Sequence, residues 1–108
     1  MQEEITPGEL AALLATPETN PLVLRDVREP WEWALAHLPG SVHIPMNLVP
    51  LRHNELPDDI KIVTVCHHGV RSLQVARFLR NAGFDQVVSL RGGVDAWSVL
   101  IDPSIARY

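Results

Sequence analysis

The chain has 108 residues, of which 46% are hydrophobic and 20% are charged, and its formal net charge is −4. This composition supports one hydrophobic core, so we expect a single domain over residues 1–108 and exclude a disordered polyanion. With no basic excess and no apolar run of about 20 residues, we expect no nucleic-acid partner and no membrane span. The single cysteine, Cys66, excludes an intrachain disulfide. The acidic N-terminus is unlike a secretory signal, so we expect a cytoplasmic location.

The first half of the chain alternates predicted strands and helices. A short strand is predicted at residues 2–5. A helix should start next, because Thr6 can cap it, Pro7 suits its first position and Glu9 completes a capping box; we expect it to end near Pro17. The apolar run Leu22-Val23-Leu24 predicts a strand buried on both faces. The next predicted elements are a helix at residues 31–36, a strand at 42–44 and a helix at 47–54.

The second half contains the strongest strand signal, at residues 60–65, where β-branched side chains are frequent. A helix is predicted at residues 72–82, and its apolar residues leave only a narrow polar stripe, so we expect it to be largely buried. Gly83 suits the left-handed end of this helix, and Phe84 the apolar contact after it. A strand at 86–90 and a helix at 94–100 complete the pattern. Such alternation predicts an α/β fold with a mostly parallel sheet.

Three segments directly follow predicted strands and carry polar residues or glycines. They are Asp26-Val27-Arg28, the loop that begins at Cys66, and Arg91-Gly92-Gly93. Ligands of open parallel sheets bind beyond the carboxyl ends of the strands. We therefore expect the three segments to contribute to one shared site.

The loop at Cys66 joins a predicted strand to the N-terminus of a helix. The first N–H groups of a helix have no partner within it and attract an anion, and a tight loop around Gly69 can turn further N–H groups inward. Together with the Arg71 guanidinium and with His67 and His68, these donors favour a stabilised thiolate at Cys66, which we expect to be exposed. Such a thiolate can attack a sulfane sulfur or a phosphorus centre. Only four residues separate Cys66 from Arg71, and so small a ring of donors favours a single sulfur atom over a phosphate.

Three motifs follow one another over nearly the whole chain. The first combines Asp26-Val27-Arg28-Glu29 with His37-Leu38-Pro39-Gly40-Ser41-Val42-His43-Ile44-Pro45. The second is the loop Cys66-His67-His68-Gly69-Val70-Arg71-Ser72, and the third is Leu90-Arg91-Gly92-Gly93-Val94-Asp95-Ala96-Trp97. In these motifs and in their order, the sequence resembles rhodanese-like sulfurtransferases, with the second motif as the active-site loop. Ala36 and Ser41 depart from the family, which usually has Gly and Ala there, and flank a turn away from Cys66.

The resemblance implies a three-layer α/β/α fold with a five-stranded, mostly parallel sheet. It also implies that Cys66 takes a sulfane sulfur from thiosulfate or a persulfide and passes it to a thiol, to cyanide or to a protein acceptor, without a metal or cofactor. The family's phosphatase and arsenate-reductase relatives have one more residue in this loop, so the shorter loop favours sulfur transfer. By the same resemblance, the substrate-binding residues are His67, His68, Gly69, Val70 and Arg71. The residues that support the site are Asp26, Arg28 and Arg91.

Plainer interpretations exist for several of these residues. Cys66 could be an inert core residue, or could bind a metal with His67 and His68, although adjacent residues rarely all face one ion. We interpret Asp26 as a structural partner of Arg28 or Arg71 rather than as a catalytic acid. Arg91 is either a substrate contact or a surface charge.

Residues further from the loop have plainer roles too. His37 and His43 are expected to bond the backbone at a turn, and Trp31 could border the site. The alternative function, from a different class, is a carrier module that docks to a partner and holds sulfur without rapid turnover.

Overall fold

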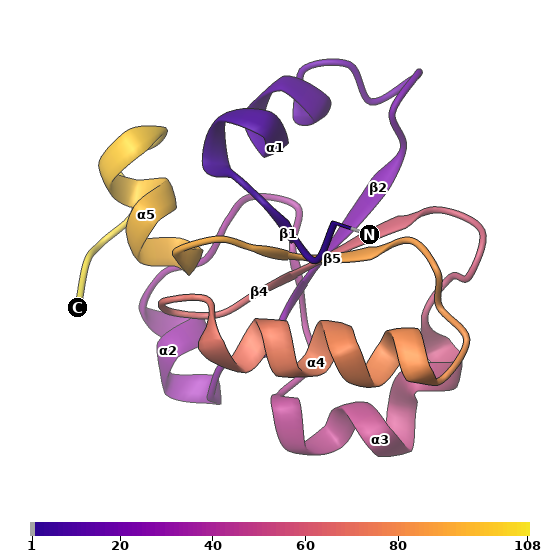
Figure 1. Cartoon of the computed structure of the whole chain (residues 1–108). Coiled ribbons are helices and arrows are strands. Elements are labelled where there is room, and N and C mark those ends of the chain that lie inside the picture. The colour runs from indigo at the N-terminus through magenta and orange to yellow at the C-terminus, as the bar shows by residue number, and fades with distance from the viewer. Residues whose placement is uncertain (1) are drawn as a thin grey trace.

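The computed structural model describes residues 2–108, which form a five-stranded sheet with helices on both faces (Figure 1). The strands are β1 (Glu4–Ile5), β2 (Leu22–Asp26), β3 (Val42–His43), β4 (Lys61–Val65) and β5 (Val87–Leu90). The α-helices are α1 (Pro7–Leu14), α2 (Pro30–Leu35), α3 (Val49–Arg52), α4 (Val70–Asn81) and α5 (Gly93–Leu100). Two short 3-10 helices, η1 (Met46–Leu48) and η2 (His53–Glu55), flank α3.

The strand order in the sheet is β1-β5-β4-β2-β3, and the pairings within it are parallel. This confirms the predicted α/β fold with a parallel sheet. β4 is the middle strand, and its last residue, Val65, pairs with Asp26 at the end of β2. The carboxyl ends of these strands therefore lie side by side, so the segments that follow them meet at one edge of the sheet.

The side chains of β4 alternate between two hydrophobic layers, as the two-residue period of a strand requires. Val63 and Val65 pack in a cluster that includes Leu10 of α1 and Trp97 of α5. Ile62 packs on the opposite face, in a cluster that draws on α3 and α4. In Figure 1, α1 and α5 accordingly lie on one side of the sheet, and α3 and α4 on the other. The three-layer arrangement expected from the family resemblance is confirmed.

Several local predictions are confirmed. Thr6 caps α1, and both hydrogen bonds of the capping box with Glu9 are present. Gly83 has a φ of 107° after α4, and the N–H of Phe84 donates to the carbonyl of Leu79, which closes that helix. The helix predicted at residues 47–54 is instead a series of three short turns, η1, α3 and η2.

Two burial predictions were wrong. α4 buries only one face, comprising Ser72, Val75, Ala76 and Leu79. Phe78 remains 39% exposed because α4 belongs to an outer layer with solvent on its far side. β2 is not fully covered either, since Leu22 and Val23 at its start are only partly buried.

Candidate active site

Strand geometry places Cys66 on the face of the sheet that α4 covers. Cys66 follows β4 directly, and its position continues the alternation of Ile62 and Thr64, whose hydroxyl donates to the carbonyl of Ser72 in α4. The thiol accordingly packs in the cluster on the α4 side. Because α4 begins four residues after Cys66, its N-terminal N–H groups lie close to the sulfur.

The Cys66 sulfur lies within hydrogen-bond distance of several donors, as predicted. Sγ accepts hydrogen bonds from the N–H of Gly69 at 3.1 Å and from the N–H of Ser72 at 3.3 Å. The Ser72 hydroxyl lies 3.3 Å from Sγ and 2.7 Å from the hydroxyl of Ser89 on β5. Ser89 was not anticipated, because its place beside Ser72 depends on the pairing of β5 with β4.

Cys66 is only 1% exposed, so the expectation of an exposed sulfur was wrong. The physical reason is its place at the end of the middle strand, with the loop and the start of α4 folded over it. Two backbone N–H groups nevertheless donate to the sulfur, so its surroundings are not purely apolar.

The start of α5 determines which way the loop backbone faces. The N–H of Val94 donates to the carbonyl of Cys66 at 2.8 Å, and the N–H of Asp95 donates to the carbonyl of His67 at 3.1 Å. A Cβ on Gly93 would lie 2.2 Å from the Cys66 carbonyl oxygen, so this approach requires glycine. With two carbonyls turned toward α5, loop N–H groups are left to face the sulfur. The predicted proximity of the Gly92-Gly93 segment to the Cys66 loop is confirmed.

Arg71 is held by Glu32, a residue that the sequence interpretation missed. Its Nη1 and Nη2 donate to Glu32 Oε1 at 2.7 Å and Oε2 at 3.0 Å. These hydrogen bonds lower the pKa of Glu32 to about 2, and Glu32 in turn raises the pKa of Arg71. The Glu32 side chain is 4% exposed, against 33% for Arg71. The pair therefore fixes the Arg71 guanidinium at the end of the loop.

Asp26 and Arg28 form a fully buried ion pair, with Arg28 Nη2 2.7 Å from Asp26 Oδ2. This is the structural role expected for Asp26. Arg28 also donates to the carbonyl of Ala36 at 2.6 Å, which ties β2 to the end of α2. His43 Nε2 lies 2.7 Å from the carbonyl of Arg28, and His37 Nδ1 lies 2.9 Å from the carbonyl of Trp33. The expectation that both histidines bond the backbone is confirmed.

His67 and His68 cover one side of the loop. The rings of the two histidines lie 3.9 Å apart, and His67 also stacks on Tyr108, another residue that the sequence interpretation missed. Burial and the proximity of His68 lower the pKa of His67, although Glu32 opposes this. The lowered pKa disfavours the charged imidazolium form of His67.

The remaining predicted site residues lie at the surface. Val70, at the first position of α4, is 67% exposed beside the loop. Arg91 is largely exposed, and its Nε lies 3.4 Å from Glu4 Oε1, which favours the surface-charge interpretation. Trp31 borders the site through an edge-on contact with Tyr108 at 5.7 Å.

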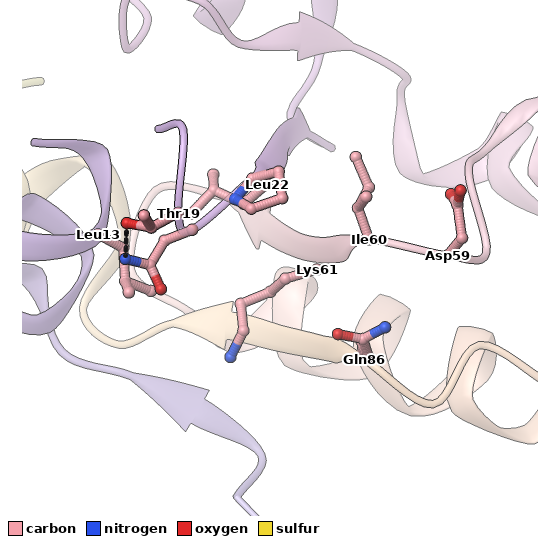
Figure 2. Close-up of a pocket in the computed structure, with 9 residues that line it drawn as sticks. Leu13, Thr19, Leu22, Asp59, Ile60, Lys61 and Gln86 are labelled. Carbon is pink, nitrogen blue, oxygen red and sulfur yellow. Dashed lines mark hydrogen bonds between the residues drawn. The ribbon is translucent and has the colours of Figure 1, made fainter. Parts of the chain in front are cut away.

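A separate pocket of about 210 Å³ lies at the opposite edge of the sheet (Figure 2). It is lined by Leu22 and Lys61, the first residues of β2 and β4, whereas Cys66 follows the last residue of β4. This pocket is therefore no part of the cysteine site. Within residues 2–108, no cluster of three or more histidine, cysteine or carboxylate side chains is arranged to hold a metal ion. No helix in the same range is long and apolar enough to cross a bilayer.

Comparisons with known proteins point to one family. The sequence model of the rhodanese-like domain matches residues 6–100. A sulfurtransferase of Allochromatium vinosum is 38% identical, over 91% of this chain and 90% of its own length. Thiosulfate sulfurtransferase GlpE of Tolumonas auensis is 30% identical, over 82% of this chain and 81% of its own. A solved structure of a rhodanese-like domain protein from Staphylococcus aureus superposes with a TM-score of 0.83 at 32% identity, covering 99% of both chains.

Proposed function

The chain belongs to the rhodanese-like domain family, and on that premise we propose that it transfers a sulfane sulfur through a persulfide on Cys66. The observation that carries the proposal is the pair of backbone N–H groups, from Gly69 and Ser72, that donate to Sγ. Similarity to a thiosulfate sulfurtransferase supports thiosulfate as one donor, with persulfides as the other class. The acceptors are thiols, cyanide as a test reagent, or a protein thiol, in the cytoplasm.

In the first half-reaction, the Cys66 thiolate attacks the sulfane sulfur of thiosulfate. The sulfur–sulfur bond of the donor breaks, sulfite leaves with its electron pair, and Cys66 becomes a persulfide anion. We assign donor binding to the loop residues 67–71. Because Glu32 already accepts from both Nη atoms of Arg71, the guanidinium is oriented before the donor arrives.

In the second half-reaction, an acceptor thiolate or cyanide attacks the outer sulfur of the persulfide. The bond between the two sulfurs breaks, the product is a new persulfide or thiocyanate, and the electron pair returns to Sγ of Cys66. The N–H groups of Gly69 and Ser72 stabilise this leaving thiolate, as donors aimed at a developing anion do. Since Cys66 is the only cysteine, the nucleophile that discharges it must come from outside the chain.

The test is to expose the purified protein to thiosulfate, measure its intact mass, then add cyanide and follow thiocyanate. We expect the mass of one added sulfur atom on Cys66 and its loss on addition of cyanide. Cys66→Ala should abolish both signals with an unchanged circular dichroism spectrum. No sulfur adduct from thiosulfate or from any persulfide donor would refute the proposal.

The second candidate, a sulfur carrier that discharges only to a docked partner, is favoured by the burial of Cys66. In that case the persulfide would form but persist in the presence of small thiols. Rapid multiple turnover with a small thiol acceptor would exclude the carrier function. A stable persulfide that a protein thiol alone removes would support it.

A further inference from the structure

Tyr108 lies outside the three sequence motifs and yet contacts several residues at the site. Its hydroxyl donates to Glu32 Oε2 at 2.6 Å and accepts from Arg28 Nη1 at 2.8 Å. Its ring stacks on His67, with the centroids 3.9 Å apart and an interplanar angle of 11°. The Tyr108 side chain therefore contacts Arg28 of the buried ion pair, Glu32, which holds Arg71, and His67 of the Cys66 loop.

The segment that carries Tyr108 is held in place after α5. Ile105 is buried in the core, and its carbonyl accepts from the Ser98 hydroxyl at 2.6 Å. Arg107 Nε lies 2.8 Å from Asp95 Oδ1, on the first turn of α5. In Figure 1 this segment runs back from α5 toward the side of the molecule where α2 lies. These contacts give the Tyr108 ring a defined place beside the loop.

The Tyr108 hydroxyl reaches Arg71 through the Glu32 carboxylate. Glu32 Oε1 accepts from Arg71 Nη1 at 2.7 Å and from the Glu29 N–H at 3.0 Å. Oε2 accepts from Arg71 Nη2 at 3.0 Å and from Tyr108. Each oxygen thus has two donors, which leaves the carboxylate one orientation. Removal of the Tyr108 hydroxyl leaves Glu32 Oε2 with a single donor. The Glu32 carboxylate and the Arg71 guanidinium bound to it can then adopt more than one orientation.

The Tyr108 ring orients His67 by stacking rather than through a hydrogen bond. The buried Nε2 of His67 has no hydrogen-bond partner among residues 2–108. Its ring instead lies against Tyr108 on one side and is in contact with His68. The same ring atom Nε2 is shielded from solvent, in line with the burial that lowers the pKa of His67.

We propose that Tyr108 is a positioning residue of the sulfur-transfer site, whose hydroxyl fixes Arg71 through Glu32 and whose ring fixes His67. The kinetic consequence rests on the sulfurtransferase activity proposed above. If Arg71 contacts the anionic donor, loss of the hydroxyl should weaken donor binding more than it slows the chemistry on Cys66. Loss of the ring should in addition expose His67.

The test compares Tyr108→Phe, which keeps the ring, with Tyr108→Ala, which loses both ring and hydroxyl. For Tyr108→Phe we expect KM for thiosulfate to rise roughly tenfold, as for one lost hydrogen bond to a charged group, with kcat within about twofold. For Tyr108→Ala we also expect the pKa of His67, followed by NMR, to rise toward its ordinary value near 6.5, while Tyr108→Phe leaves it low.

The control is Thr6→Ala, which removes the hydroxyl that caps α1, a helix that contributes no residue to the site. It should lower Tm with no change in KM or in the His67 titration. If both Tyr108 variants lower Tm as this control does but keep the wild-type KM, Tyr108 is merely structural and the inference is overturned. If the wild-type protein transfers no sulfur, the proposed function fails instead, and an unchanged His67 titration in Tyr108→Ala would still refute the stacking role.

Discussion

Replacement of Glu32 by glutamine tests the electrostatic core of the site. The pKa of Glu32 is lowered from 4.5 to about 2, chiefly by the hydrogen bonds from Arg71. At about 1.4 kcal/mol per unit, this corresponds to roughly 3 kcal/mol in favour of the charged form in the folded state. Because Arg71 is one third exposed, solvent screening reduces the expected loss in Glu32→Gln to about 2 kcal/mol. For a domain of this size that is a fall in Tm of roughly 10 °C.

The stability that Glu32→Gln loses should depend on pH in a defined direction. The pKa of Glu32 is lower in the folded than in the unfolded chain, so its contribution is complete above the unfolded value of 4.5. It is lost as the pH falls from 4.5 toward about 2. The free energies of unfolding of wild type and Glu32→Gln should therefore differ most near neutral pH and converge in acid.

Urea unfolding of both proteins at about pH 7, 4 and 2.5 measures this difference. Glu55→Gln is the matched control, because Glu55 also pairs with an arginine but the pair is exposed, with side chains 40% and 55% accessible. Glu55→Gln should lower the free energy of unfolding by less than about 1 kcal/mol. A destabilisation of Glu32→Gln that stays constant from neutral pH down to about pH 2.5 would refute the reasoning, since the loss would then come from packing and not from charge.

Three further changes probe separate features. Gly69→Ala should lower the free energy of unfolding by roughly 1–3 kcal/mol and slow sulfur transfer. The φ of Gly69 is +100°, and the new Cβ would lie 3.1 Å from the Gly92 nitrogen. A turnover rate equal to that of the wild type would contradict this. Relative to a free small thiol, buried Cys66 should lose more of its reaction rate toward a bulky aromatic disulfide than toward iodoacetamide, and an equal loss with both reagents would show the sulfur to be accessible. Thr6→Ala should lose about 1 kcal/mol of stability with unchanged sulfur transfer, and a change in turnover would show that α1 influences the site.

The part of the site that could be predicted is the part built from neighbours in sequence. The β-branched strand, Cys66 and the helix after it form one continuous segment, so strand alternation and helix ends define where the sulfur lies and what donates to it. The start of α5 could be anticipated too, because Gly92 and Gly93 follow a strand in a parallel sheet.

Contacts between distant segments could not be predicted. Glu32 is 39 residues from Arg71, and Tyr108 is 76 residues from Glu32, so neither hydrogen bond leaves a periodic signal. The only local signal at Glu32 is its capping box with Glu29, which indicates a helix start and not an ion pair. Burial of α4 was overestimated because composition does not reveal that a helix lies in an outer layer with one face in water.

The two hydrogen bonds from α5 to the carbonyls of Cys66 and His67 constrain how this loop could evolve. They anchor the loop's first residues to one helix, while Ser72 is anchored in another, so the chain between them must span a fixed gap. With both ends held, an inserted residue has to be taken up between His67 and Ser72, where the loop would bulge and widen the ring of N–H groups around the sulfur. The hydrogen bonds from α5 can stay in place while the loop changes size, so the same two anchors can serve a one-atom cargo or a larger tetrahedral group.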